Sequence, residues 1–594
     1  MKTEYASRYV LLGTLFTVMA ALIFGQHVAL LMDNQRGEIL DDIRKSHLGS
    51  EWTIYPPRGL IFDRKGQLLA GNQIFYEVGV DYSRIGDAHQ IALMSNVFLG
   101  LDYYQVKVTV ENPISPSQVY FPLNKRVEKE KVDGLKAFLE PSENDGRDEK
   151  VKKAQLAAKI SGLELRPYLE RIYPEKSLAS NLIGYVGHRD DGTPIGVFGV
   201  EGKYDEVLAG LPLKIWVPND PRMVKELPAI PEGTSLVLTI DREVQAAVEK
   251  ILDEEVEKSG SDTGVIVVLD PKTGEILALA STPRIDISRY WEYNEQMQKK
   301  KFVFNRGIGA TYEPGSVFKP LTMAAAFDKG VVNEKTTYLD RGAIEVGGNV
   351  IYNWDRAGHG KQTMQGCLQY SLNVCLAWVA TQLGSKDFYS YMQAFGLGQA
   401  TGVDMAGEMT GILKLPGDAD WTDGELGVNS FGQGVSATPI QMASALAALA
   451  NDGKMMTPHI VRAIIKDGQQ YMIEPRVSSM PVSAETARTL TEILARSLEA
   501  EASAALVDGY RVAGKTGTAE IAIPGVGYTS GETNASFAGW GPVDDPRFLV
   551  YIWLEKPSTS IWGSEVAAPI FPKVVQQLTL LMNIPPDRYR KAGN

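Results

Sequence analysis

A serine and a lysine at the start of one apolar stretch are the first residues of this chain that could perform chemistry together. Ser316 and Lys319 precede or open the run Leu321 to Phe327, which predicts a buried helix with both residues in its first turn. The spacing i, i+3 places the Lys319 amine beside the Ser316 hydroxyl on one helix face. A neutral lysine there could take the hydroxyl proton and create a nucleophile, and the helix N-terminus would favour the developing negative charge. Taken alone, a capping serine followed by a solvated lysine explains the pair better.

Two later stretches change that interpretation. Ser371-Leu372-Asn373 lies in the helical pattern Met364 to Leu383, and Lys515-Thr516-Gly517-Thr518 opens an extended run that continues through Ile523. Ser-x-x-Lys, Ser-x-Asn and Lys-Thr-Gly in this order form the signature of penicillin-binding proteins and serine β-lactamases, so the chain resembles that group. Each motif alone is weak evidence, whereas the ordered set is strong evidence.

The strand that carries Lys515 is expected to belong to an antiparallel sheet. Apolar runs at 535–540 and 548–553 follow it and predict two further strands. Gly514 and Gly517 predict that a ligand backbone can approach this strand closely, because neither residue has a side chain in the way.

A second Lys-Thr-Gly has a structural explanation. Lys272-Thr273-Gly274 follows Asp270-Pro271 and joins the apolar strands expected at 265–269 and 275–279. These are the residue types that a hairpin turn requires. We therefore assign this copy to the fold and the copy at Lys515 to the site.

Composition restricts the class of protein. The chain has 594 residues, of which 44% are hydrophobic and 22% are charged, so it is an ordinary folded protein with room for more than one domain. A net charge of -12 argues against a nucleic-acid partner, because no basic excess is present to neutralise phosphates.

The only two cysteines are expected to be free, buried thiols. If Cys367 and Cys375 both lie on the helix that carries Ser371, their eight-residue separation corresponds to about 12 Å. That distance exceeds the limit of roughly 7 Å for a disulfide. No metal site is expected on them, and few cysteines fit an exported bacterial enzyme.

An apolar segment near the N-terminus predicts a membrane anchor. Residues 9–32 are apolar apart from Gln26 and His27, contain no acidic residue, lysine or arginine, and are long enough to cross a bilayer. A buried helix or a cleavable signal peptide are the alternatives, but the run is long for a signal peptide and has no convincing cleavage site. Lys2 and Arg8 before it mildly favour a cytoplasmic N-terminus, with the remaining chain outside the cytoplasmic membrane.

The stretch after the anchor narrows the resemblance to class B penicillin-binding proteins. Residues 57–70 form a hairpin pattern that is similar to the opening motif of that family. Arg171-Ile172-Tyr173-Pro174 and Gly196 to Glu201 resemble two further elements of its non-catalytic module. Where the family usually has a glycine close after Tyr-Pro, this chain has Glu175-Lys176.

The resemblance implies an α+β fold, in which the transpeptidase domain has an antiparallel sheet with helices on both sides. We expect a cytoplasmic tail at 1–8, the anchor at 9–32, an elongated N-terminal pedestal at 33–230 and the transpeptidase domain at 231–594. A short polar helix is expected from Gln35 to His47, and residues 81–165, with their dense alternating charges, are expected to form a lobe inserted in the pedestal. The Pro- and Gly-containing stretch 228–233 is expected to be the junction.

The resemblance also implies an activity and its residues. The chain would be a peptidoglycan D,D-transpeptidase that crosslinks stem peptides of lipid II-derived glycan in bacterial cell-wall synthesis and is inhibited by β-lactams. Ser316 would be the nucleophile, Lys319 the base, Ser371 the proton donor and Asn373 a positioning group. Lys515, Thr516 and Thr518 would bind the substrate carboxylate, next to Gly517, and the N–H groups of Ser316 and Thr518 would form the oxyanion hole. No metal or organic cofactor is needed.

Other functions remain as alternatives. A β-lactam sensor or a β-lactamase-like protein would share the three motifs but does not explain residues 58–70. A catalytically weak scaffold would be marked by decay of the three motifs, which are intact here. A Ser-His-Asp hydrolase is poorly supported, because the sequence has no Gly-x-Ser-x-Gly motif. A bifunctional enzyme would need a glycosyltransferase domain before residue 231, and no candidate for its catalytic carboxylates is found there.

The expected partner is a polytopic membrane glycosyltransferase of the shape, elongation, division and sporulation family. The sequence leaves elongation and division roles open: Asn353-Trp354 with Gly358-His359-Gly360 resembles elongation enzymes, whereas residues 395–408 resemble division and sporulation types.

Overall fold

The computed structural model describes residues 2–32, 49–115, 117–218, 230–297, 302–501, 503–522, 527–528 and 531–590. The chain divides into two compact units, one formed by Met1–Pro57 with Ala209–Gly233 and the other by Arg58–Leu208 with Thr234–Asn594. The helix expected from Gln35 to His47 lies outside the described residues, as does part of the junction expected at 228–233.

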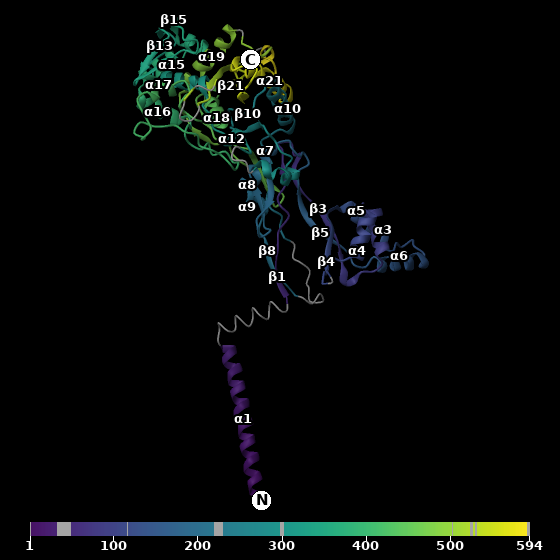
Figure 1. The fold of residues 1–594 in the computed structure, drawn as a ribbon. Coiled ribbons are helices and arrows are strands. Elements are labelled where there is room, and N and C mark those ends of the chain that lie inside the picture. Colours follow the sequence, from purple (N-terminus) through teal and green to yellow (C-terminus); the bar gives the residue numbers. More distant parts are fainter. Residues whose placement is uncertain are drawn as a thin grey trace. The chain divides into compact units, whose positions relative to one another are not determined.

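The first unit contains the expected apolar helix. Helix α1 spans Lys2–Met32, and within it Tyr9–Ala29 is long and apolar enough to cross a membrane (Figure 1). The unit also contains a two-stranded antiparallel ribbon of β1 (Gly49–Ile54) and β8 (Leu213–Pro218), in which Gly49 lies opposite Pro218. Two segments about 160 residues apart in the sequence are thereby joined through backbone hydrogen bonds.

A five-stranded antiparallel sheet is the centre of the second unit. Its order is β11-β10-β22-β21-β20. The strands are β10 (Thr263–Leu269), β11 (Ile276–Ser281), β20 (Ala513–Glu520), β21 (Thr533–Gly541) and β22 (Phe548–Glu555). Strand β20, which carries Lys515, lies at the edge of this sheet. Among the described residues no strand pairs with its outer side, so the backbone groups on that side can pair with an extended ligand.

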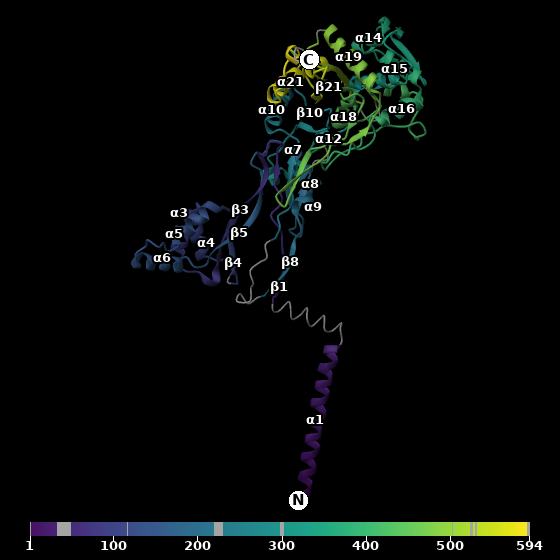
Figure 2. The same cartoon turned by 180° about the vertical axis from the view of Figure 1, so that it is seen from behind.

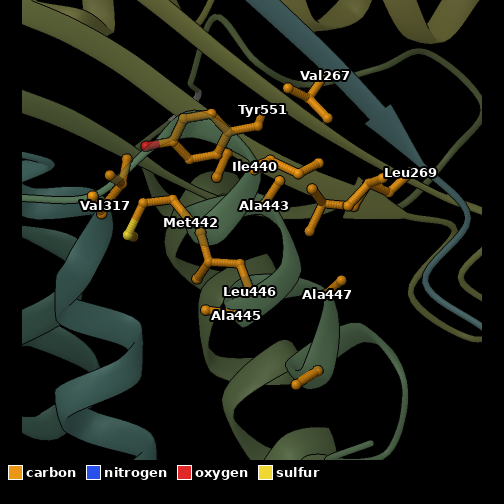
Figure 3. Packing of buried hydrophobic residues seen from close by; sticks show 14 of the residues in the cluster. Val267, Leu269, Val317, Ile440, Met442, Ala443, Ala445, Leu446, Ala447 and Tyr551 are labelled. Atoms are coloured by element: carbon orange, nitrogen blue, oxygen red, sulfur yellow. The ribbon is translucent and has the colours of Figure 1, made fainter. Parts of the chain in front are cut away.

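Helices cover both faces of this sheet, as expected from the sequence. Val267 and Leu269 of β10 pack against α18 (Pro439–Ala450), and Figure 3 shows them near Ile440 and Ala443 of that helix. The alternate residues of β10, Ile266 and Val268, face the opposite cluster, which includes α10 (Arg242–Ser259) and α21 (Ile570–Leu581). Because both faces are buried, β10 is apolar at nearly every position instead of alternating with polar residues.

Most of the remaining elements after residue 231 lie close to this sheet (Figures 1 and 2). The helices are η3 (Ile287–Tyr293), α11 (Asn294–Met297), α12 (Arg306–Gly309), η4 (Gly315–Phe318), α13 (Lys319–Asp328), α14 (Met364–Gln369), α15 (Asn373–Leu383), α16 (Ser385–Ala394), α17 (Glu425–Asn429), α19 (Ala484–Ala500), α20 (Gly563–Val566) and α22 (Asp587–Arg590). Three antiparallel pairs join β12 (Thr337–Asp340) to β15 (Gly360–Thr363), β13 (Ala343–Val346) to β14 (Asn349–Tyr352), and β16 (Met455–Met456) to β19 (Val477–Ser479).

Strands from the range expected for the pedestal share a sheet with strands that follow residue 231. The sheet order is β18-β17-β9-β2-β3-β4, and β5 also pairs with β3. The strands are β2 (Ile61–Phe62), β3 (Leu68–Asp81), β4 (Tyr120–Glu128), β5 (Leu163–Ile172), β9 (Ser235–Leu238), β17 (Val461–Lys466) and β18 (Gln469–Met472). Strand β9, the first strand after residue 231, pairs in parallel with β2, which lies in the range expected for the pedestal. The two parts are therefore joined by backbone hydrogen bonds as well as by side chains.

The lobe at 81–165 has its own small core. Its elements are η1 (Tyr82–Arg84), α3 (Ala88–Leu99), α4 (Tyr103–Glu111), α5 (Lys129–Leu139) and α6 (Arg147–Lys159), beside β3, β4 and β5. The dense alternating charges expected within residues 81–165 lie in large part in α5 and α6. Between the lobe and β9 the chain forms α7 (Ser180–Ile183), β6 (Tyr185–His188), β7 (Pro194–Val197), α8 (Gly199–Lys203) and α9 (Asp205–Ala209).

A buried ion cluster explains why the pedestal motifs occur together. Glu201 is fully buried and accepts hydrogen bonds from Arg58 Nε at 2.6 Å and from Arg171 Nε at 2.7 Å. Burial opposes the charge of Glu201, but the guanidinium groups of Arg171 and Arg58 outweigh it and hold the pKa of this carboxyl below its usual value. The charges remain in the interior because they neutralise one another. At the departure from the family pattern, Lys176 adopts a positive φ of 57° and so keeps a tight turn without glycine.

Candidate active site

Ser316 lies in a tight turn that packs against the edge strand. It belongs to η4, which leads directly into α13, as the sequence predicts in outline. Gly315 has a φ of 59°, and a Cβ atom there would lie 2.8 Å from the carbonyl oxygen of Thr518 on β20. Only glycine fits this close approach. The Ser316 side chain remains half-buried at the wall of a cavity.

Lys319 joins two of the sequence motifs. Its side chain is fully buried, and Nζ donates to the Ser371 carbonyl oxygen at 2.5 Å, to Ser371 Oγ at 3.1 Å and to Asn373 Oδ1 at 2.8 Å. Within the described residues, these partners come from the Ser371–Asn373 segment, not from Ser316. The lysine thus fixes Ser371 and Asn373 relative to the turn that carries the nucleophile.

The charges around the site favour a neutral amine on Lys319. Burial lowers the pKa of Lys319 well below its usual value, and the positive charge of Lys515 lowers it further. Lys515 is only 6% exposed, and burial lowers its pKa to about 8, although Glu501 acts in the opposite direction. The site therefore holds one lysine that readily loses its proton beside another that keeps its charge near neutral pH.

The expected helix from Met364 to Leu383 is broken at Ser371, and the prediction of free cysteines was wrong. Helix α14 ends at Gln369, Ser371 takes a positive φ of 54°, and α15 begins at Asn373. The break folds the chain back on itself, so the Cα atoms of Cys367 and Cys375 are 5.9 Å apart and the two residues form a disulfide. The distance of about 12 Å expected along one straight helix does not apply. The disulfide closes the loop that presents Ser371 and Asn373.

Gly514 and Gly517 of β20 allow close packing within the protein, not the close approach of a ligand that the sequence predicts. A Cβ atom on Gly517 would lie 2.3 Å from Ser536 Oγ and 2.8 Å from Val317 Cγ1, and one on Gly514 would lie 2.7 Å from the Ala538 carbonyl oxygen. All of these neighbours belong to the protein itself. The absent side chains let β20 pack against β21 and the Ser316 turn; they do not make room for a ligand.

Thr518 is oriented toward the cavity by a neighbouring backbone group. The Gly563 N–H donates to Thr518 Oγ1 at 3.0 Å. Because that contact uses a lone pair of the hydroxyl oxygen, the hydroxyl proton remains available to donate to an anion in the cavity. Both Thr516 and Thr518 line the cavity, as the sequence predicts for the carboxylate-binding residues.

The cavity has a volume of about 710 Å³ and brings the sequence motifs together with residues that they do not contain. The lining includes Ser316, Ser371, Asn373, Thr516 and Thr518, and the additional residues Trp354, His359, Gln369, Tyr370, Gln433, Glu501, Glu520, Gly531, Thr533, Ile561, Trp562, Ser564 and Glu565. Trp354 and Trp562 meet edge to face, with ring centroids 5.5 Å apart. Asn353-Trp354 belongs to a sequence pattern that resembles elongation enzymes, whereas no sequence signal indicates Trp562 or Glu501.

Comparisons with known proteins agree with this geometry. The penicillin binding protein transpeptidase domain matches residues 264–576, and the penicillin-binding protein dimerisation domain matches residues 53–214. Stage V sporulation protein D of Bacillus subtilis is 31% identical, with 96% of this chain and 86% of the relative aligned. Peptidoglycan D,D-transpeptidase FtsI of Escherichia coli is 28% identical, over 89% of this chain and 84% of the relative.

A solved structure supports the same assignment. Penicillin binding protein 3 from Mycobacterium tuberculosis, in complex with aztreonam, matches with a TM-score of 0.66 and 26% identity, and the alignment covers 90% of this chain and 98% of that one. The transpeptidase match alone spans more than half of the chain. With the three motifs joined at one cavity and the pedestal motifs joined at Glu201, the chain belongs to the class B penicillin-binding proteins.

Proposed function

We propose that this chain is a peptidoglycan D,D-transpeptidase whose acyl-enzyme forms on Ser316. The observation that carries the proposal is the fully buried Lys319 amine, which is held by Ser371 and Asn373, two residues that line the same cavity as Ser316. Relatives named for D,D-transpeptidase activity and an aztreonam complex of a related fold support the substrate class and the inhibition by β-lactams.

The first half of the reaction transfers an acyl group to the protein. Neutral Lys319 takes the proton of Ser316 Oγ as this oxygen attacks the carbonyl carbon of the penultimate D-alanine. The N–H groups of Ser316 and Thr518 stabilise the oxyanion, an effect of about 2.7–4 kcal/mol for each donor. The C–N bond then breaks, and Ser371 passes a proton to the leaving amine of the terminal D-alanine.

The second half transfers the acyl group to an amine of a neighbouring stem. That amine loses a proton to the same relay and attacks the ester, and Ser316 Oγ leaves with a proton returned through Lys319. Lys515, Thr516 and Thr518 hold the terminal carboxylate of the donor during the first half. Asn373 holds the substrate amide and keeps Lys319 in place, through the 2.8 Å hydrogen bond to Nζ.

The activity is tested by release of D-alanine from a donor peptide that ends in D-Ala-D-Ala. We expect a bell-shaped pH dependence of the acylation rate. The rate falls at low pH, where Lys319 becomes charged, and it falls again as the pH rises through about 8, the pKa of Lys515, because the uncharged lysine no longer binds the carboxylate. A folded protein that releases no D-alanine at any pH contradicts the proposal.

The N-terminal helix is a membrane anchor, and we propose that its N-terminus is cytoplasmic and the catalytic part is outside. The proposed functional boundaries are a tail at 1–8, the anchor at 9–32, the pedestal at 33–230 with the lobe at 81–165, and the transpeptidase domain at 231–594. The apolar segment and the preceding Lys2 and Arg8 support this orientation.

We further propose that the anchor and pedestal bind a polytopic membrane glycosyltransferase of the shape, elongation, division and sporulation family. The support is chemical, because crosslinking needs newly made glycan and the two matched domains of this chain are a dimerisation and a transpeptidase domain. The full chain is expected to co-purify with the glycosyltransferase from membranes. A chain deleted of residues 1–230 that binds it equally well contradicts this assignment.

A further inference from the structure

Helix α15, which presents Asn373 to the active site, begins without a cap from its own sequence. The residue at its cap position is Leu372, whose side chain cannot accept a hydrogen bond. The Val374 N–H instead donates to Asn353 Oδ1 at 3.1 Å. A side chain from the segment after β14 thus satisfies a backbone donor that helix starts leave open.

The orientation of the Asn353 amide is fixed by a buried carboxylate. Asn353 Nδ2 donates to Asp340 Oδ2 at 2.7 Å and to the Ala357 carbonyl oxygen at 3.0 Å. Asp340 also accepts from the backbone N–H groups of Gly342 at 2.9 Å and His359 at 3.2 Å. Asp340 and Asn353 are each only 2% exposed. Every partner of the carboxylate is a donor, so the amide can present only its oxygen to α15.

The same strand end also holds the Asn373 side chain. Asn373 Nδ2 donates to the carbonyl oxygen of Tyr352, the residue before Asn353, at 3.1 Å. The other side of this amide, Oδ1, accepts from Lys319 Nζ. The end of β14 therefore holds α15 at its first turn and Asn373 at its side chain, and Asn373 in turn contacts the lysine.

We propose that Asp340 and Asn353 are positioning residues for acyl transfer, which hold Asn373 and Ser371 in place against Lys319. This inference rests on the proposed function, because it assigns a task within that reaction. Neither side chain lines the cavity, so both act through α15 and the Ser371 turn. A displacement of about 1 Å in a reacting group can slow an enzyme by roughly 10²-fold.

Two isosteric substitutions test the proposal. Asn353→Asp replaces the donor that faces Asp340 and the Ala357 carbonyl oxygen with an acceptor. Asp340→Asn turns an NH₂ group toward an N–H donor in either orientation of the amide. In both variants we expect the acylation rate constant for a fluorescent penicillin, measured by stopped flow per folded molecule, to fall by roughly 10²-fold. The dissociation constant of the initial complex is expected to change by less than the rate constant.

Asn305→Asp is the matched control, because Asn305 is also a buried asparagine and is only 4% exposed. Its side chain accepts a hydrogen bond from the helix N–H of Gly307 and donates one to the carbonyl oxygen of Asn181. It does not line the cavity. We expect it to lower the melting temperature without changing the acylation rate constant of the folded protein. If the two test variants behave like this control, or change only the dissociation constant, the assignment is wrong. A parent protein that is not acylated would instead overturn the proposed function.

Discussion

Ser316→Ala is expected to reduce covalent labelling by fluorescent penicillin to background while the protein stays folded. A β-lactam contains a strained amide that resembles the acyl donor, and its opening by Ser316 Oγ leaves an ester that hydrolyses slowly. Without Oγ the cavity keeps other hydroxyl groups but loses the one that is assigned as the nucleophile. The change deletes one half-buried oxygen and leaves the backbone of the turn unaltered, so the protein is expected to stay folded.

Intact mass and peptide mapping locate the adduct on the parent protein, and thermal melting reports the fold of the variant. Ser371→Ala is the matched control, because Ser371 also contacts Lys319 but is assigned to proton transfer. It is expected to slow labelling and still carry its adduct on Ser316. An adduct on another residue of the parent, or full labelling of Ser316→Ala, would contradict the assignment of the nucleophile.

The candidate active site could be predicted because each of its three motifs is short and the motifs follow one another in a fixed order along the chain. Ser316 and Lys319 lie in one turn, and Ser371 and Asn373 lie in another. The short spacing within each pair is therefore enough to keep its two residues close together, and Lys319 contacts both residues of the second pair. The strand at Lys515 and the sheet around it were indicated by apolar runs, and antiparallel pairing follows when such strands are linked in succession. The fold class was therefore confirmed.

The break at Ser371 could not be read from periodicity. Leu368 and Leu372 are both buried and continue the helical spacing across it, so the pattern looks uninterrupted. The Leu372 N–H bonds to the Cys367 carbonyl oxygen at 3.0 Å, which closes a turn that only Ser371 in a left-handed conformation allows. A non-glycine residue gives no sequence warning of such a φ angle. The wrong prediction about the cysteines followed from this one error.

Residues that reach the cavity from distant segments were also missed. Trp562 follows the last strand of the sheet and Glu501 follows α19, so both depend on tertiary contacts that no local pattern encodes. The pairing of β9 with β2 was missed for the same reason, because two short apolar strands can pair with many neighbours.

Lys515→Ala is expected to abolish acylation, whereas Lys272→Ala is expected to leave it unchanged. Lys515 is 6% exposed and directly precedes Thr516, which lines the cavity. Its loss removes the cation that we propose binds the substrate carboxylate and that helps to lower the pKa of Lys319. Both effects slow the acylation step. If Lys319 keeps its proton it cannot activate Ser316, and a substrate whose carboxylate has no lysine to bind is misplaced relative to Ser316.

Lys272 belongs to the same tripeptide motif but has a different environment. It lies in the turn between β10 and β11, where its N–H donates to Asp270 Oδ1 at 2.8 Å and its 47% exposed side chain pairs with Asp545. Exposed pairs contribute about 0–1 kcal/mol to stability, so the variant should melt close to the parent. The measurement is the second-order rate constant of penicillin acylation, with thermal melting as the folding control. If Lys272→Ala lost acylation while melting normally, and Lys515→Ala reacted like the parent, then β20 would not be the strand that binds the substrate, and the order of motifs that defines the site would be wrong.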